Sequence, residues 1–424
     1  MSTRREQPAT YAALFRSRDF RSLFLAHLAS LAGDQVGKIA LTLLVFARSH
    51  SALLAALAYA TSFLPWALGG PVLAAVADRL PRRRVMVGCD LARAGIIALA
   101  AVPGVPVPGL LVLMLAASLL APPFEAARAA VLPEVLTGED YVLGTSLNAL
   151  VNQASQLAGF GAGGVLVVVL SARGALLFDA ATFLVSAALL VTGLHCRAQP
   201  ERAGAARPSL LADAAAGART VFGNRRLRFL VGLSWAGVAF AVVPEALAAP
   251  YAAAMHRGPG TVGLLMAAPA AGSAVGALVL GRVVGARTRS RLMLPMAGLS
   301  ALPLLACITR PSLPVTLSLF AVAGAGGAYQ ITANTAFSLG VPPAARARAF
   351  GLAVSGIQVA QGLGIGLAGA AAVVLPPSTV IALAGVAGLA AVGALALRWP
   401  GDVEPVVEPH RVIDLTVLEP LAVR

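Results

Sequence analysis

A short charged hairpin between two long apolar runs constrains the fold of this chain more than any other feature. Residues 78–84 read D-R-L-P-R-R-R, which places four arginines and one aspartate within seven positions. The flanking runs, residues 52–77 and 85–102, are each close to the roughly 20 residues that a helix needs to cross a bilayer. Because charged side chains avoid hydrocarbon, the hairpin is predicted to be a tight cytoplasmic loop between two transmembrane helices.

Similar apolar runs recur along the whole chain. With 58% hydrophobic and 12% charged residues, the chain is too apolar for a water-soluble domain of this size. We therefore expect an all-α membrane protein with twelve transmembrane helices in two pseudo-symmetric six-helix bundles. The expected spans are 23–46, 52–77, 85–102, 109–130, 141–170 and 174–194 in the first bundle, and 227–253, 261–284, 292–308, 313–339, 347–374 and 378–397 in the second.

An internal repeat supports the division into two bundles. Gln153, Gln156 and Gly159 recur as Gln358, Gln361 and Gly364, at one constant offset. We expect five segments: a cytoplasmic N-terminal segment (1–22), the N-terminal bundle (23–194), a cytoplasmic linker with an interfacial helix (195–226), the C-terminal bundle (227–398) and a flexible cytoplasmic tail (399–424).

The distribution of positive charge predicts the orientation. The formal net charge is +14, and the arginines gather in alternate loops between apolar runs, as orientation signals do. The loops predicted to lie outside hold only Arg48, Arg173, Arg257 and Arg310. This pattern indicates a multi-pass protein of the cell membrane with both termini in the cytoplasm. It also argues against nucleic acid as the partner of the basic charge.

The hairpin resembles the signature loop of the major facilitator superfamily, which Asp78, Arg79, Arg82 and Arg83 match. Further along, the order of Arg128, Pro133–Glu134, Asn148, Gln153, Gly159–Gly164 and Phe178–Phe183 resembles the efflux branch that includes enterobactin-exporter-like and macrolide-efflux-like proteins. The resemblance implies proton-driven export of an organic molecule. It also implies that Arg128 can meet Asp78 and form an inner gate with the hairpin arginines. Phe160 departs from the pattern, because related antiporters often have proline there.

Ionisable residues inside apolar runs are costly and call for an explanation. Asp34 and Lys38 stand mid-way along the first run, four residues apart, so they share a helix face and can pair. They are candidates for proton coupling, with Glu245 as a second candidate. A permanent structural pair is an equal alternative. Asp90 and Arg93 are expected to form an interfacial pair at the start of the third run.

Polar side chains within the other runs are candidates for a substrate cavity, and hydrogen bonding between helices is the alternative role. These candidates are Glu125, Asn152, Gln153, Gln156, Asp179, Tyr329, Gln330, Asn334, Gln358 and Gln361. Glycines four residues apart are expected to allow close helix packing. They are Gly159 and Gly163 in the fifth run, and Gly362 and Gly366 in the eleventh.

These observations predict a secondary active transporter that exports a small amphiphilic molecule, of drug, macrolide or siderophore type, in exchange for protons. The chain has no nucleotide-binding motif and no metal-ligand spacing, so we expect neither an enzyme nor a cofactor or metal. The expected partners are the lipid bilayer, the substrate and protons, with the protein acting as a monomer. Uptake or facilitated diffusion by the same fold is the nearest alternative, and a non-transporting membrane sensor or scaffold is another.

Overall fold

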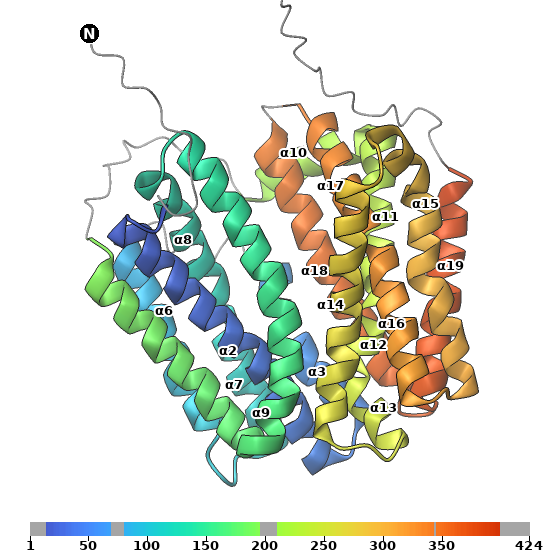
Figure 1. Cartoon of the computed structure of the whole chain (residues 1–424), viewed down its shortest axis with the longest axis horizontal. Coiled ribbons are helices and arrows are strands. Elements are labelled where there is room, and N and C mark those ends of the chain that lie inside the picture. Colours follow the sequence, from blue (N-terminus) through green and yellow to red (C-terminus); the bar gives the residue numbers. More distant parts are fainter. Residues whose placement is uncertain (1–13, 69–79, 196–209, 343–344, 399–424) are drawn as a thin grey trace, which may run out of the picture.

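The computed structural model describes residues 14–68, 80–195, 210–342 and 345–398. Within these ranges every regular element is a helix and no strand occurs, which confirms the predicted all-α fold class. Figure 1 shows two groups of helices side by side, with α2 to α9 in one group and α11 to α19 in the other. The limits of the five predicted segments stay a prediction.

The first group begins with a long capped helix. The Ser17 side chain accepts a hydrogen bond from the Phe20 backbone N–H, and the helix ends where His50 takes a left-handed conformation. The helices of this group are α2 (Arg18–Ser49), α3 (Ala52–Ala60), α4 (Leu64–Leu68), α6 (Arg82–Ala100), α7 (Val107–Leu119), α8 (Ala121–Val135) and α9 (Glu139–Gly193).

The second group follows a helix in the region where an interfacial helix is predicted, α10 (Leu210–Gly223). Its members are α11 (Arg225–Ala241), α12 (Val243–Ala246), α13 (Ala248–Ala254), α14 (Pro259–Arg282), α15 (Ala286–Ala301), a 3-10 helix (Leu302–Thr309), α16 (Leu313–Gly327), α17 (Tyr329–Gly340), α18 (Arg346–Ala371) and α19 (Pro377–Ala396).

Each predicted run contains helix in its described part, and the differences are breaks within runs. The fourth and seventh runs are interrupted where prolines begin a new helix: Pro122 near the start of α8 and Pro244 in α12. The element α9 has 55 residues, too long for a single crossing at 1.5 Å per residue, and it is broken at Ser171, where φ is 67°. Nine described helices are long and apolar enough to cross a membrane. The count of twelve crossings stays a prediction.

The two groups pack closely toward one end of the bundle, which we call the Ser49 end because α2 ends there at Ser49. The α9 and α14 backbones meet at Gly164 and Gly263, where a Cβ added to Gly164 would lie 2.8 Å from the Gly263 Cα. Gly369 of α18 packs in the same way on Ala56 of α3. Toward the other end the ribbons of α9 and α14 diverge (Figure 1). The groups are therefore held together mainly at the Ser49 end.

Candidate transport site

The described residues line two cavities inside the bundle, one associated with each group. The first, of about 270 Å³, is lined by side chains of α2, α6, α7, α8 and α9 and carries most of the charge. Its polar and charged lining includes His27, Asp34, Lys38, Arg93, Glu125 and Asn152. The second, of about 220 Å³, is lined mainly by α11 to α17.

An ion pair between two helices stands on the wall of the first cavity. Arg93 of α6 donates from Nη2 to Asp34 Oδ1 of α2 at 2.6 Å, and its guanidinium lies 4.1 Å from the centre of the Phe183 ring. Lys38, the expected partner of Asp34, instead donates to Gln35 Oε1 at 3.1 Å. The predicted Asp34–Lys38 pair is therefore wrong. Helical spacing brings only residues of one helix together, whereas packing presented Asp34 with an arginine from another helix.

The predicted interfacial pair of Asp90 and Arg93 is also wrong. Asp90 is fully buried and accepts a hydrogen bond from Ser186 of α9 at 2.6 Å, while Arg93 turns to Asp34. Both side chains lie inside the helix bundle, because the polar face of α6 turns toward α9 instead of the membrane interface, and Arg93 reaches Asp34 of α2.

Asp179 of α9 occupies a closed position between helices. It is 1% exposed, and a Cβ added at Gly33 or Gly37 of α2 would lie 2.6 Å or 2.1 Å from its carboxylate oxygens. Among the described residues, neither of these oxygens has a hydrogen-bond partner. Asp179 lines neither cavity, which corrects its assignment to the substrate cavity. The two glycines leave it just enough room against α2.

A second charged cluster stands at one edge of the first cavity. Glu125 of α8 accepts two hydrogen bonds from Arg128, at 3.0 Å and 2.7 Å, and lies 3.5 Å from His27 Nδ1. His27 Nε2 is 3.2 Å from Asn152 Oδ1. Glu125 and Asn152, two of the candidates for a substrate cavity, thus line the first cavity, and their contact with a substrate stays a prediction.

The inner gate predicted for the hairpin can be followed only in part. Asp78 and Arg79 lie outside the described residues, so the contact between Asp78 and Arg128 stays a prediction. Arg82 and Arg83 lie in the first turn of α6 instead of in the loop. Arg82 binds Glu134 and the Ala130 carbonyl of α8, and Arg83 binds the Val191 carbonyl of α9.

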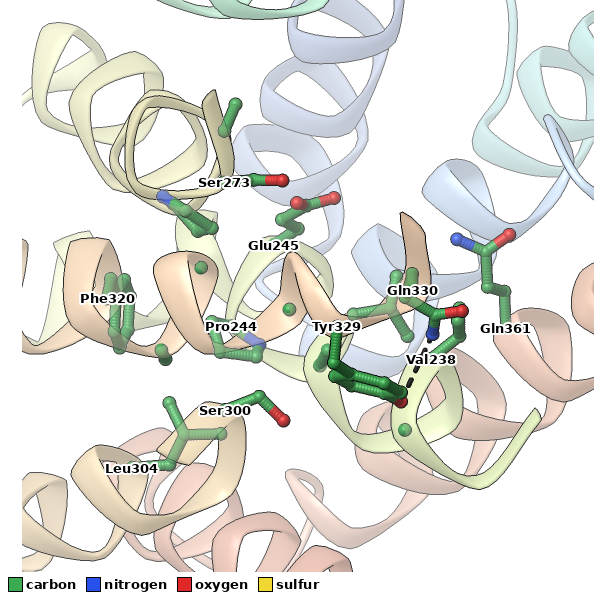
Figure 2. Close-up of a pocket in the computed structure, with 18 of the residues that line it drawn as sticks. Val238, Pro244, Glu245, Ser273, Ser300, Leu304, Phe320, Tyr329, Gln330 and Gln361 are labelled. Carbon is green, nitrogen blue, oxygen red and sulfur yellow. Dashed lines mark hydrogen bonds between the residues drawn. The ribbon is translucent and has the colours of Figure 1, made fainter. Parts of the chain in front are cut away.

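The second cavity has one carboxylate and several neutral hydrogen-bonding groups on its wall. Figure 2 shows Glu245, Tyr329, Gln330 and Gln361 around it. Gln330 donates to the Tyr329 hydroxyl at 3.2 Å, and that hydroxyl donates to the Leu233 carbonyl at 3.1 Å.

Four of the predicted amide and tyrosine candidates line this cavity: Gln156, Tyr329, Gln330 and Gln361. Asn334 and Gln358 line neither of the two cavities, and Asn334 is exposed. The side chain of Gln153 lies outside the described part of the structure. Gln156 and Gln361, which the internal repeat connects, both line the second cavity, and a role of these amides in substrate binding stays a prediction.

Glu245 makes a contact that the sequence did not suggest. Tyr59 of α3 donates a hydrogen bond to Glu245 Oε2 of α12 at 2.6 Å, and so joins the two helix groups. Tyr59 is 2% exposed. The sequence offered one indication of a polar contact here, because the hydroxyl of Tyr59 stands in the otherwise apolar helix ALLAALAYA. Its partner could not be identified, because Glu245 lies 186 positions further along the chain.

The predicted packing glycines fall into two classes. A Cβ added at Gly159 or Gly163 would lie within 3 Å of Gln35 or Ile39, so α9 packs tightly on α2 there. A Cβ added at Gly362 or Gly366 would meet nothing within 4 Å. Their neighbour Gly364 makes the close contact in α18, against the Ala239 carbonyl of α11. Spacing alone therefore selected the wrong face of α18.

A helical membrane bundle with internal cavities of this kind is typical of small-molecule transporters. The sequence model of the Major Facilitator Superfamily matches residues 23–246 and 227–415. The chain belongs to this superfamily and is a membrane transporter, not an enzyme. Within the described ranges, no group of three or more His, Cys, Asp or Glu side chains could hold a metal ion.

A curated relative agrees with this assignment, and several solved structures share the fold. The chain is 27% identical over 183 residues to the uncharacterized MFS-type transporter YkuC of Bacillus subtilis (strain 168), and the match spans 42% of each chain. It thus covers less than half of the length of that relative.

Similar solved structures include the nucleoside transporter NupG, with a TM-score of 0.69 and 14% identity over 89% of this chain and 99% of that one. A bacterial homologue of the iron transporter ferroportin, in an inward-facing state, has a TM-score of 0.67 and 15% identity over 92% and 98% of the two chains. At this level of identity the likeness concerns the fold alone.

Proposed function

We propose that this protein is a proton-coupled exporter of a small amphiphilic organic molecule, acting as a monomer in the cell membrane with both termini in the cytoplasm. The orientation rests on the arginine distribution, and the direction rests on the resemblance to the efflux branch of the superfamily. The observation that carries proton coupling is an unbalanced cluster of buried charges between α2, α6 and α9.

This cluster contains more acids than bases. Asp34, Asp90 and Asp179 all interact electrostatically with Arg93, and Lys38 is the second cation, close to Asp34 and Asp179. With every group ionised, three negative charges would face two positive ones. A buried charge without compensation is strongly destabilising, so the cluster is most stable when it holds one proton.

The position of Asp34 supports an exchange of this proton with the cavity. Its side chain is 24% exposed and lines the first cavity, whereas the Arg93 side chain is only 7% exposed. Water in the cavity can reach Asp34. A proton arriving there weakens the pair with Arg93, and Arg93 is then free to interact with Asp179 or Asp90. Proton binding at Asp34 thus changes the contacts between α2, α6 and α9.

The two cavities support an amphiphilic substrate. Aromatic side chains such as Phe124, Phe183 and Phe320 stand beside amides and hydroxyls on their walls. Apolar surfaces with a few polar groups suit organic molecules that have both an apolar body and hydrogen-bonding groups. Of the other coupling candidates, Lys38 lines the first cavity and Glu245 the second.

The proposal is tested by transport into inverted membrane vesicles, with a panel of labelled macrolides and siderophores. Accumulation of one of them should require an acidic vesicle interior and should disappear when a protonophore collapses the gradient. Asp34→Asn should abolish accumulation but leave exchange of substrate down its own gradient. Asp140→Asn, at the start of α9 and outside the cluster, is the matched control and should behave as the parent.

Three results would contradict parts of the proposal. Equal transport with and without the gradient would indicate a facilitative transporter, and accumulation only in right-side-out vesicles would indicate uptake. An Asp34→Asn variant that still accumulates substrate would remove Asp34 from proton coupling.

A further inference from the structure

The hydrogen bond between Tyr59 and Glu245 connects the second cavity with the closed Ser49 end. Tyr59 belongs to α3 and Glu245 to α12, so the bond crosses from one helix group to the other. The two groups also meet nearby, where Gly369 packs on Ala56 one turn before Tyr59. The groups cannot separate at this end while Tyr59 stays bound to Glu245.

Glu245 also takes part in the wall of the second cavity. Its side chain lines this cavity together with Ser273 and Gln330 (Figure 2). It follows Pro244, in the short helix α12 between α11 and α13, so the carboxylate is held where the helix is interrupted. One carboxylate oxygen of Glu245 accepts the hydrogen bond from the Tyr59 hydroxyl. Because Glu245 lines the cavity, a proton or ligand in the cavity can reach the same carboxylate.

We propose that Tyr59 is a positioning residue that acts through Glu245 and holds the Ser49 end closed for as long as the carboxylate is ionised. A hydrogen bond to an ionised carboxylate is about twice as strong as one between neutral groups. When Glu245 takes up a proton from the cavity, the bond to Tyr59 weakens and separation of the two groups becomes easier. Protonation of Glu245 from the cavity thus controls whether the two helix groups stay closed at the Ser49 end.

The other groups around Glu245 are consistent with this role. Among the described residues, the titratable groups that interact with Glu245 are Tyr59 of α3 and Lys38 of α2. Lys38 interacts with the carboxylate through its charge, whereas Tyr59 alone among these groups makes a direct hydrogen bond to it. Both belong to the first helix group, so both hold the ionised Glu245 toward it.

The inference deepens the proposed function but needs neither its substrate nor its direction, so it is tested without transport. Spin labels are placed at Val169 of α9 and at Arg257, before α14, which are exposed positions of the two groups near the Ser49 end. The distance between the labels is measured on the full chain in lipid nanodiscs, after replacement of the three native cysteines. Acidification should shift the parent from the short toward the long distance.

Tyr59→Phe should populate the long distance already at alkaline pH and should lose most of the pH dependence. The ratio of closed to open protein should fall roughly tenfold to a hundredfold, as expected for loss of a hydrogen bond to a charged group. Tyr251→Phe is the matched control. It removes another buried tyrosine hydroxyl, from a ring that packs on Phe320 within the second group, and should leave the pH profile of the parent unchanged.

Glu245→Gln gives an independent readout if Tyr59→Phe fails to fold, because the amide can still accept the hydrogen bond but cannot ionise. At every pH, this variant should show the distance distribution that the parent shows at acidic pH. A pH-dependent distance in Tyr59→Phe or in Glu245→Gln, equal to that of the parent, would overturn the inference. Proton-driven transport could fail while this distance still responds to pH, so the two proposals fail separately.

Discussion

The ion pair between Asp34 and Arg93 can be distinguished by mutation from the Asp34–Lys38 pair that helical spacing predicts. Asp34→Asn leaves the Arg93 guanidinium in a site where its side chain is only 7% exposed. Breaking a buried pair by removing one partner typically costs about 3–5 kcal/mol. We expect a loss smaller than this range, because Asp90 and Asp179 also interact with Arg93, so two acids and two bases remain in the cluster after the change.

The double variant Asp34→Asn/Arg93→Met should recover at least half of this loss, because it leaves neither partner alone. In contrast, Asp34→Asn/Lys38→Met should recover nothing, since Arg93 still lacks its partner at 2.6 Å. Met fills a volume similar to the aliphatic part of either cation, so the cavity left behind is small in both cases. The two double variants therefore differ in which charge remains unpaired.

The assay is the half-life of monodisperse protein in detergent during heating, because membrane proteins of this size generally unfold irreversibly. All four combinations of Asp34→Asn and Arg93→Met are compared under identical conditions, as in a double-mutant cycle. A double variant no more stable than the weaker single variant would refute the pair. Recovery by the Lys38→Met combination instead would show that the local pair predicted from spacing is the real one.

Three further predictions concern packing, topology and the buried carboxyl. Gly163→Leu should destabilise the protein by displacing α9 from α2, whereas Gly362→Leu should have little effect; thermal stability in detergent checks both, and equal losses would contradict the contacts described here. Single cysteines at Ser49 and Thr288 should react with an impermeant maleimide from opposite sides of the membrane, the first from outside; reaction from one side would mean that the orientation or the number of crossings is wrong. Asp179→Asn should retain or increase thermal stability, because neither carboxylate oxygen has a partner among the described residues, while the pH dependence of transport should change; a large loss of stability would indicate that the charge is compensated.

The sequence by itself determined the fold class, the approximate positions of the helices and the superfamily. Apolar runs of membrane-spanning length need no knowledge of their neighbours, because each helix satisfies its own backbone hydrogen bonds. The same reasoning indicated a helix in the region of α10 and the ionisable residues inside the helices, but not the break after Ala241. It also identified Gln156 and Gln361, which the repeat connects and the second cavity brings together.

Only the tertiary structure decided which of these side chains meet. Sequence spacing compares residues of one helix, so it paired Asp34 with Lys38, although α6 presents Arg93 to the same carboxylate. The contact between Tyr59 and Glu245 joins residues 186 positions apart, and no local pattern predicts such a contact. The rotation of each helix about its axis sets these pairings. That rotation follows from how neighbouring helices pack, at glycines such as Gly163, rather than from the helix's own sequence.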